Sequence, residues 1–241
     1  MENIIIIGDV HGQINTLKAL IEQLPKGTKI VFVGDLIDRG INSKEVIQFI
    51  IDNNYDCVLG NHEQFMIDSI GKITGNIAPK DIWFKACNGG EETFASYYFD
   101  RKDRRYPSGF DTELYLEHID FLKTLPLFKE YKFKGFDNLV VSHSIIQPFW
   151  KKREVQEFTY TERTSILWNR IVTNENTFIK GLDKDYGTNI YNVFGHTYLF
   201  EPFIGEHVAD IDCGAAYYKK LVALEYPSMR VFEQENIDLS F

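Results

Sequence analysis

Residues 4–12 read Ile-Ile-Ile-Ile-Gly-Asp-Val-His-Gly: four β-branched residues, then a glycine, then two polar side chains, Asp9 and His11, around a valine. β-Branched residues favour strands, and a short continuous apolar run is typical of a strand that is buried on both faces. The sequence therefore predicts a buried strand over residues 4–7 that carries polar side chains just past its carboxyl end.

The same pattern recurs further along the chain. Predicted buried strands cover residues 4–7, 30–33 and 57–59, and each is followed by a glycine at a spacing of 26 residues: Gly8, Gly34 and Gly60. Apolar residues at helical spacing predict helices over residues 14–24 and 46–51. Alternating strands and helices of this kind imply parallel strands with helices on their faces, and ligands bind at the carboxyl edge of such sheets.

The rest of the chain completes an α/β fold. Further helices are predicted over 82–99 and 114–125, within a helical insertion at about residues 72–137 that includes a basic cluster of Arg101, Lys102, Arg104 and Arg105. Further strands are predicted over 139–141, 192–194, 208–211, 221–224 and 230–232, the last three as an antiparallel meander. Because no Pro/Gly-rich linker divides the chain, residues 1–241 are predicted to form one domain with two mixed sheets between helical layers.

Composition narrows the class of protein. With 26 Lys and Arg against 35 Asp and Glu, the formal net charge is −9, which argues against tracking of nucleic acid and against docking on an anionic membrane. The three cysteines are widely spaced, so no disulfide framework is predicted and a reducing cytoplasm is expected. The longest aliphatic run is too short to span a membrane, which needs about 20 residues.

Histidines gather at the predicted ligand edge. Four of the six follow a predicted strand, beside Asp9, Asp35 and Asn61: His11, His62, His143 and His196. Nitrogen and oxygen donors without thiolate suit Mn²⁺, Fe or Zn²⁺. Because these groups are too many for one ion, two metals are predicted, and a carboxylate with two oxygens can bridge them.

Five sequence blocks resemble the ordered signature of the calcineurin-like metallophosphoesterases, specifically the phosphoprotein phosphatase branch and its phage lambda type of serine/threonine phosphatase. The blocks are Gly8-Asp-Val-His-Gly12, Gly34-Asp-Leu-Ile-Asp-Arg-Gly40, Gly60-Asn-His-Glu63, Val140-Val-Ser-His143 and Phe194-Gly-His-Thr197. The resemblance also takes in Asn88-Gly-Gly90, Leu167-Trp-Asn-Arg170 and Ile211-Asp-Cys-Gly-Ala215. It implies a metallophosphoesterase-like four-layer α/β/β/α sandwich with two mixed sheets.

The resemblance also implies roles for individual residues. One metal is assigned to Asp9, His11 and Asp35, and the second to Asp35, Asn61, His143 and His196, with Asp35 as the bridge. His62 is assigned as the general acid and Asp38 as its partner, while Arg39 and Arg170 are assigned to bind the phosphoryl group. Two divalent ions, with Mn preferred over Fe or Zn, are the expected cofactors.

Ordinary structural roles compete with these assignments. Asp9, Asp35 and Asn61 are residue types that also form turns and helix N-caps, although the set with its histidines favours metal. Asp38 and Arg39 could form a surface ion pair, and Arg170 could be an exposed helix charge. His118 and His207 match nothing and are assigned to surface or core, and Asp210 and Asp212 are left without a role.

Three functions follow from this site. The first is a serine/threonine protein phosphatase, with dual specificity as an option, that acts on a phosphorylated protein or peptide through a hydroxide bridging the metals. The alternative is a symmetrical dinucleoside tetraphosphatase, a sister branch ranked lower because it usually lacks the aspartate found here as Asp38 and has Asp in place of Glu63. A non-catalytic metal-bound interaction scaffold ranks last, because no ligand is missing.

Overall fold

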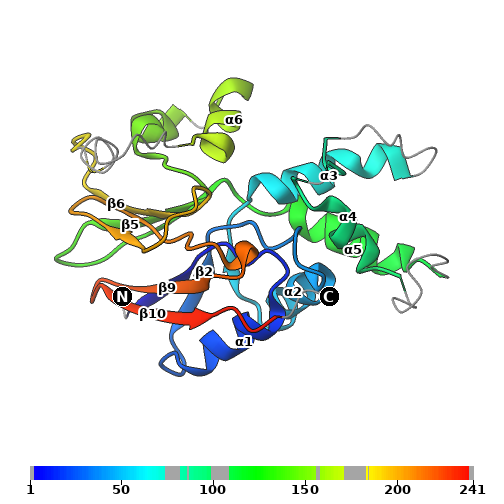
Figure 1. The fold of residues 1–241 in the computed structure, drawn as a ribbon. Coiled ribbons are helices and arrows are strands. Elements are labelled where there is room, and N and C mark those ends of the chain that lie inside the picture. The colour runs from blue at the N-terminus through cyan, green and yellow to red at the C-terminus, as the bar shows by residue number, and fades with distance from the viewer. Residues whose placement is uncertain are drawn as a thin grey trace.

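The computed structural model describes residues 3–73, 82–85, 87–98, 109–155, 158–170, 183 and 185–238. The described residues form two five-stranded sheets that stack on one another, with helices α1 and α2 beyond one sheet and α6 beyond the other (Figure 1). The predicted α/β/β/α sandwich with two mixed sheets is therefore confirmed. No helix in the described ranges combines the length and the apolar character needed to cross a bilayer.

The first sheet has the strand order β10-β9-β1-β2-β3. Its strands are β1 (Ile4–Ile7), β2 (Lys29–Phe32), β3 (Asp56–Cys57), β9 (Lys220–Tyr226) and β10 (Arg230–Glu235). The strands β1, β2 and β3 are parallel, as their alternation with α1 (Ile14–Glu22) and α2 (Ser43–Asp52) predicts. The strand β9 pairs antiparallel with β1, and β10 pairs antiparallel with β9.

The second sheet has the order β4-β5-β6-β8-β7. Its strands are β4 (Phe128–Tyr131), β5 (Asn138–Ser142), β6 (Ile190–Phe194), β7 (Phe203–Ile204) and β8 (Val208–Asp210). The three central strands β5, β6 and β8 are parallel, and the edge strands β4 and β7 are antiparallel to their neighbours. The outer face of this sheet packs against the 3₁₀ helix η1 (Gln147–Val155) and α6 (Tyr160–Trp168) through an apolar cluster.

The four isoleucines of β1 separate the two main layers of the core. Ile4 and Ile6 belong to the apolar cluster between the sheets, together with residues such as Val141 of β5. Ile5 and Ile7 point to the opposite face, where they join the cluster that α1 and α2 cover. This alternation follows from the two-residue period of a strand and explains why the run is apolar at every position.

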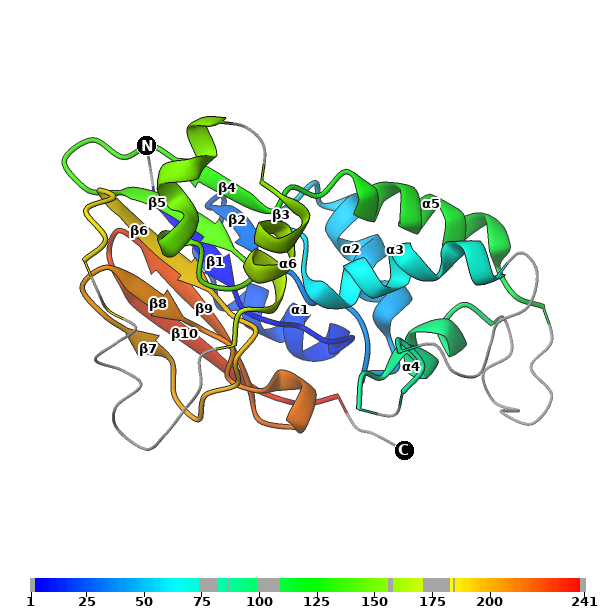
Figure 2. The ribbon, with the colours of Figure 1, turned by 90° about the horizontal axis from the view of Figure 1, so that it is seen from above.

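A group of helices extends beyond the sheets (Figure 2). It contains α3 (Asn61–Ile73), α4 (Gly90–Ala95) and α5 (Thr112–Lys123), with α5 lying beside α3. The helix predicted over 114–125 is confirmed, whereas the one predicted over 82–99 is reduced to α4. Gly89 has a φ of 77°, a left-handed conformation that interrupts a helix in front of α4. The basic cluster at 101–105 lies outside the described residues, and the assignment of 72–137 as an insertion in one domain stays a prediction.

The predicted C-terminal meander is wrong in one respect. Strand β8 belongs to the second sheet, and the chain crosses to the first sheet before β9 begins. Of the three strands in the predicted meander, β9 and β10 pair with each other as an antiparallel hairpin, and β8 does not join them. Strand spacing alone does not distinguish a hairpin from a crossing between stacked sheets, because the apolar pattern of each strand is the same in both arrangements. The strands β4 and β7, and the helices η1 and α6, are further elements that the sequence pattern did not predict.

Candidate metal centre

The predicted site residues converge at the carboxyl ends of parallel strands from both sheets. Asp9 and His11 follow β1, Asp35 follows β2, and Asn61 and His62 begin α3 after β3. From the second sheet, His143 follows β5 and His196 follows β6. The side chains of these seven residues are all buried, with at most 5% of the residue surface exposed. The structure thus brings together residues that lie far apart in the sequence.

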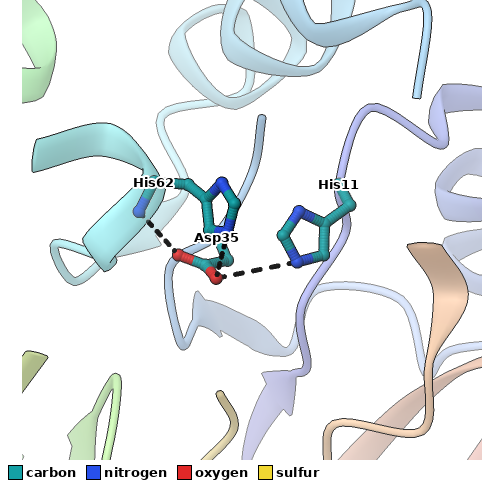
Figure 3. A group of neighbouring side chains, drawn as sticks. All are labelled: His11, Asp35 and His62. Carbon is teal, nitrogen blue, oxygen red and sulfur yellow. Dashed lines mark hydrogen bonds and ion pairs between the residues drawn. The ribbon is translucent and has the colours of Figure 1, made fainter. Parts of the chain in front are cut away.

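Asp35 lies at the centre of this cluster. Its Oδ2 is 3.6 Å from Nε2 of His11 and 3.8 Å from Nε2 of His62 (Figure 3). Its Oδ1 is 3.3 Å from Nε2 of His143. Two groups of potential metal ligands result, each with donor atoms within 4.8 Å of one another: His11, Asp35 and His62, and Asp35, His143 and His196. Since both groups include Asp35, its position suits a bridging carboxylate.

Backbone carbonyls determine which ring nitrogen is available in two of the histidines. Nδ1 of His11 lies 2.8 Å from the carbonyl oxygen of Ile37, and Nδ1 of His143 lies 2.9 Å from that of Val33. A carbonyl can only accept, so Nδ1 carries the proton and Nε2 of the neutral ring presents a lone pair. In both rings this Nε2 is the atom that faces Asp35.

Around His143 several atoms that can bind a metal lie close together. Nε2 of His143 lies 2.8 Å from Oδ1 of Asn61 and 3.1 Å from Nδ1 of His196. With the proton of His143 on Nδ1, its Nε2 and Oδ1 of Asn61 are both acceptors with no proton between them, and a cation is the group that would satisfy both. Nε2 of His196 is buried and has no hydrogen-bond partner among the described residues. The donor set therefore fits a divalent ion.

The protonation states divide the four histidines into two classes. Burial lowers the pKa of His11, His143 and His196, to about 3 for His196, so these rings are neutral near pH 7 and can donate lone pairs. Burial also opposes charge on His62, but Asp35 and Asp38 raise its pKa above the ordinary value. His62 is therefore the histidine best placed to hold a proton.

The two metal-assigned aspartates also differ. Burial opposes ionisation of Asp35, yet the surrounding histidines, His143 first, hold its pKa well below the usual range. Burial and the neighbouring carboxyls Asp212, Asp35 and Asp210 raise the pKa of Asp9 well above its usual value. A cation beside Asp9 would relieve this repulsion, which supports a metal at this point.

Asp9 is positioned differently from the sequence-based assignment. It belongs to neither group of three ligands, and its carboxylate accepts from the backbone N–H of His196, at 3.3 Å and 3.2 Å from the two oxygens. Gly195 allows this approach, because a Cβ there would come within 2.0 Å of Oδ1 of Asp9. His62 takes the place of Asp9 in the first group. The assignment of Asp9 as a metal ligand therefore stays a proposal.

Asp38 and His62 form a buried pair next to the metal-ligand groups. Nδ1 of His62 is 2.5 Å from Oδ2 of Asp38, which is fully buried. The Asp38 carboxylate also accepts from Nε1 of Trp83, at 2.9 Å from Oδ2, and from the hydroxyl of Thr93, at 2.6 Å from Oδ1. These contacts orient the His62 ring so that Nε2 points toward Asp35. The surface ion pair considered for Asp38 is therefore excluded.

The two predicted phosphate-binding arginines lie in different environments. The Arg39 guanidinium lies at the ligand groups, with Nη1 2.5 Å from Nε2 of His11 and Nη2 3.1 Å from Nε2 of His62. Arg170 is exposed and follows α6. Its charge nevertheless contributes to lowering the pKa of His143 and His196, so it lies on the side of the second group.

Backbone strain is concentrated at the same residues. His11, Asp35, Asp38, Arg39 and His196 all have positive φ, between 49° and 73°. Non-glycine residues in this conformation cost on the order of 1–3 kcal/mol each and persist where the surroundings impose them. Strain at these positions is consistent with a functional site that the fold holds in place.

The sequence patterns gave no structural role to three supporting residues. Glu63 accepts from the backbone N–H groups of Asp35 and Leu36, both at 2.8 Å, and so supports the loop after β2. Trp83 and Thr93 hold Asp38, as described above. Glu63 stands inside the Gly-Asn-His-Glu block, so its position in the sequence was a usable signal. Trp83 and Thr93 lie 45 and 55 residues from Asp38, and no sequence pattern connects them with it.

The two histidines outside the site have structural positions. His118 belongs to the core and His207 is half-buried.

Residues 2–200 match the family model of the calcineurin-like phosphoesterases. This chain belongs to that family. The matched range includes the ordered sequence blocks, the four buried histidines of the site and Asp35. The calcineurin-like phosphoesterase described here is therefore a phosphoesterase enzyme, as predicted, and it carries candidate metal-binding groups of histidine and aspartate.

Named relatives of this phosphoesterase are similar along almost their whole length. It is 25% identical to the bis(5′-nucleosyl)-tetraphosphatase PrpE [asymmetrical] of Bacillus thuringiensis (strain Al Hakam), over 93% of this chain and 90% of the relative. It is 27% identical to the protein of the same name from Oceanobacillus iheyensis, over 92% of this chain and 88% of that relative. The crystal structure of a candidate diadenosine tetraphosphatase has the same fold, with a TM-score of 0.64 at 18% identity, over 98% of this chain and 95% of that one.

Proposed function

We propose that this phosphoesterase hydrolyses bis(5′-nucleosyl) tetraphosphates with two divalent ions, preferably Mn²⁺. The observation that carries the reaction class is the sharing of Asp35 by two groups of ligands. The substrate is supported by relatives that bear this activity in their names and match more than nine-tenths of this chain. The proposal corresponds to the alternative function from the sequence analysis, a dinucleoside tetraphosphatase. The asymmetrical rather than symmetrical cleavage of the substrate is taken from the names of the relatives.

Each residue of the site has a proposed task. His11, Asp35, Asn61, His143 and His196, with Asp9, would hold the two ions. When bound, the ions would lower the pKa of a water molecule, so that hydroxide would be available near neutral pH. Arg39 and Arg170 would bind the non-bridging oxygens of the phosphoryl group, where negative charge is spread in the transition state.

His62 would protonate the leaving oxygen. Its ring is held by Asp38 through Nδ1, which leaves Nε2 directed toward Asp35 and therefore toward the reacting phosphate. A leaving nucleotide is a weakly basic phosphate oxygen and needs little protonation, whereas the alkoxide of a serine side chain is strongly basic and needs it. The contribution of His62 is therefore expected to depend on the leaving group.

A phosphoserine or phosphothreonine substrate is the second candidate. The observation that favours it is the fully buried Asp38 carboxylate, which accepts from His62, Trp83 and Thr93. Such precise support for a general acid is most useful when the leaving group is an alkoxide. This candidate would place a phosphorylated protein or peptide, rather than a dinucleotide, at the same ions.

A substrate comparison tests the proposal. The protein is stripped with a chelator and reloaded with Mn²⁺, and kcat/KM is measured for diadenosine tetraphosphate and for a phosphoserine peptide. We expect the dinucleotide to be preferred by at least about tenfold and to yield AMP and ATP, the asymmetrical products. A preference for the phosphopeptide would overturn the proposal in favour of the second candidate, and two molecules of ADP would overturn the asymmetrical mode.

A further inference from the structure

Two exposed aromatic side chains and a half-buried one lie together next to the metal-ligand groups. Tyr198, Phe200 and Tyr217, which we call the aromatic ledge, are linked through Tyr198: its ring centroid is 5.3 Å from that of Phe200 and 5.6 Å from that of Tyr217. Phe200 is 78% exposed and Tyr217 is 51% exposed. Exposed aromatic side chains that lie together, rather than singly, are typical of binding surfaces.

The aromatic ledge contacts the proposed phosphate-binding residue Arg39 and lies close to His196 in the sequence. The guanidinium carbon of Arg39 lies 5.4 Å from the ring centroid of Tyr217. Tyr198 is two residues from His196, and its ring packs on Gly214, where a Cβ would come within 2.5 Å of Cε2 of Tyr198. The ledge therefore begins where the proposed phosphate-binding side chain ends.

Local hydrogen bonds hold both segments of the ledge. The backbone N–H of Leu199 donates to the carbonyl oxygen of Asp212 at 2.9 Å, which ties the segment after β6 to the segment after β8. Tyr217 ends the 3₁₀ turn η2 (Ala215–Tyr217), and its N–H donates to the carbonyl oxygen of Gly214 at 2.8 Å. A surface fixed in this way is preorganised, which reduces the entropy lost when a ligand binds.

We propose that the aromatic ledge binds a nucleobase of the substrate, with Tyr217 as the residue that contacts it beside Arg39. This inference rests on the proposed function, because only a nucleotide substrate has a base next to its phosphates. A phosphate held by Arg39 places the attached ribose and base just beyond the guanidinium, where Tyr217 lies. Stacking on aromatic rings and Arg is tolerant of base identity, so adenine and guanine should be accepted similarly.

A positioning role for Tyr217 is the main competing explanation. The ring could serve only to hold the Arg39 guanidinium through the cation–π contact. In that case loss of the ring weakens every phosphate ligand to the same extent. A base-binding role weakens only ligands that carry a base, so the two explanations make opposite predictions for a ligand pair that differs in the base alone.

AMP and ribose 5-phosphate are such a pair. Their dissociation constants are measured by isothermal titration calorimetry on the full chain loaded with Mn²⁺, for the wild type, Tyr217→Ala and Tyr217→Phe. Tyr218→Ala is the matched control, because Tyr218 is the next residue and is 56% exposed, but lies outside the ledge. We expect AMP to bind about tenfold or more tighter than ribose 5-phosphate, from the usual size of base stacking. Tyr217→Ala should bring this ratio close to one, and Tyr217→Phe and Tyr218→Ala should preserve it.

Two results would overturn the inference. One is a wild-type ratio close to one, and the other is an equal weakening of AMP and ribose 5-phosphate in Tyr217→Ala, which indicates positioning of Arg39 alone. The binding assay does not require turnover of a dinucleotide. A chain that binds AMP through Tyr217 but does not hydrolyse diadenosine tetraphosphate would refute the proposed function and leave the base site standing, so the two failures are distinguishable.

Discussion

His62 and Asp38 are joined by a contact of 2.5 Å between Nδ1 and Oδ2, and both side chains are almost fully buried. The other ring nitrogen of His62, Nε2, faces Asp35. Burial opposes protonation of His62, but the negative charges of Asp35 and Asp38 raise its pKa. This arrangement is the basis of the proposed role of His62 as the general acid.

Replacement of His62 by Asn should affect substrates unequally. A general acid contributes about 10²–10⁴-fold when the leaving group is strongly basic. Hydrolysis of a phosphoserine peptide should therefore fall by that factor, whereas hydrolysis of diadenosine tetraphosphate should fall by less than about tenfold. Steady-state kinetics on both substrates, with His207→Asn as a control histidine, provide the comparison.

Metal content in the same variant separates two roles of His62. As the general acid, its loss should leave the number of bound ions unchanged. As a member of the first ligand group, its loss should remove an ion. Loss of metal together with equal loss of activity on both substrates would show that His62 is a ligand.

Glu63→Gln should destabilise the loop that carries Asp35. The carboxylate accepts from the backbone N–H groups of Asp35, Gly60 and Leu36, and a glutamine would turn an N–H₂ group toward these donors. An unsatisfied buried donor costs about 1–3 kcal/mol. Urea unfolding should show a loss of this size, and Mn²⁺ affinity should fall because Asp35 shifts. Unchanged stability and affinity would rule out a supporting role for Glu63.

His118 should make the stability of the fold dependent on pH. Its Nδ1 lies 2.6 Å from the Tyr97 hydroxyl and its Nε2 lies 3.0 Å from Oε1 of Gln48, contacts that satisfy a neutral ring. Burial lowers its pKa from 6.5 to about 4. Below pH 6.5 the unfolded chain binds a proton that the folded chain excludes, so this part of the stability is complete above pH 6.5 and is lost as the pH falls toward 4.

The loss of stability on acidification can be calculated from the two pKa values of His118. The difference between the pKa values of His118 in the unfolded and folded chain corresponds to roughly 3 kcal/mol of unfolding free energy at most. Chemical unfolding between pH 7 and pH 4 should show a smaller loss in His118→Gln than in the wild type, while His207→Gln should follow the wild type. Parallel pH profiles for the wild type and His118→Gln would contradict this account of His118.

The three parallel strands of the first sheet and the gathering of most site residues could be predicted from local patterns. Gly8, Gly34 and Gly60 each follow one of three parallel strands, so the polar residues after them had to meet at one edge. The crossing between β8 and β9 and the support of Asp38 by Trp83 could not be predicted, because they depend on contacts between distant segments that share no periodicity. The position of Asp9 against the His196 backbone depends on the close approach of Gly195, which a single sequence does not reveal.

The number of divalent ions that Asp35 holds is the most direct test of the whole account. The wild type and Asp35→Asn are loaded with Mn²⁺, desalted and analysed by inductively coupled plasma mass spectrometry. The account predicts two ions per wild-type chain and the loss of both in Asp35→Asn, because this carboxylate belongs to both ligand groups. One ion in the wild type, or two ions retained by Asp35→Asn, would contradict it.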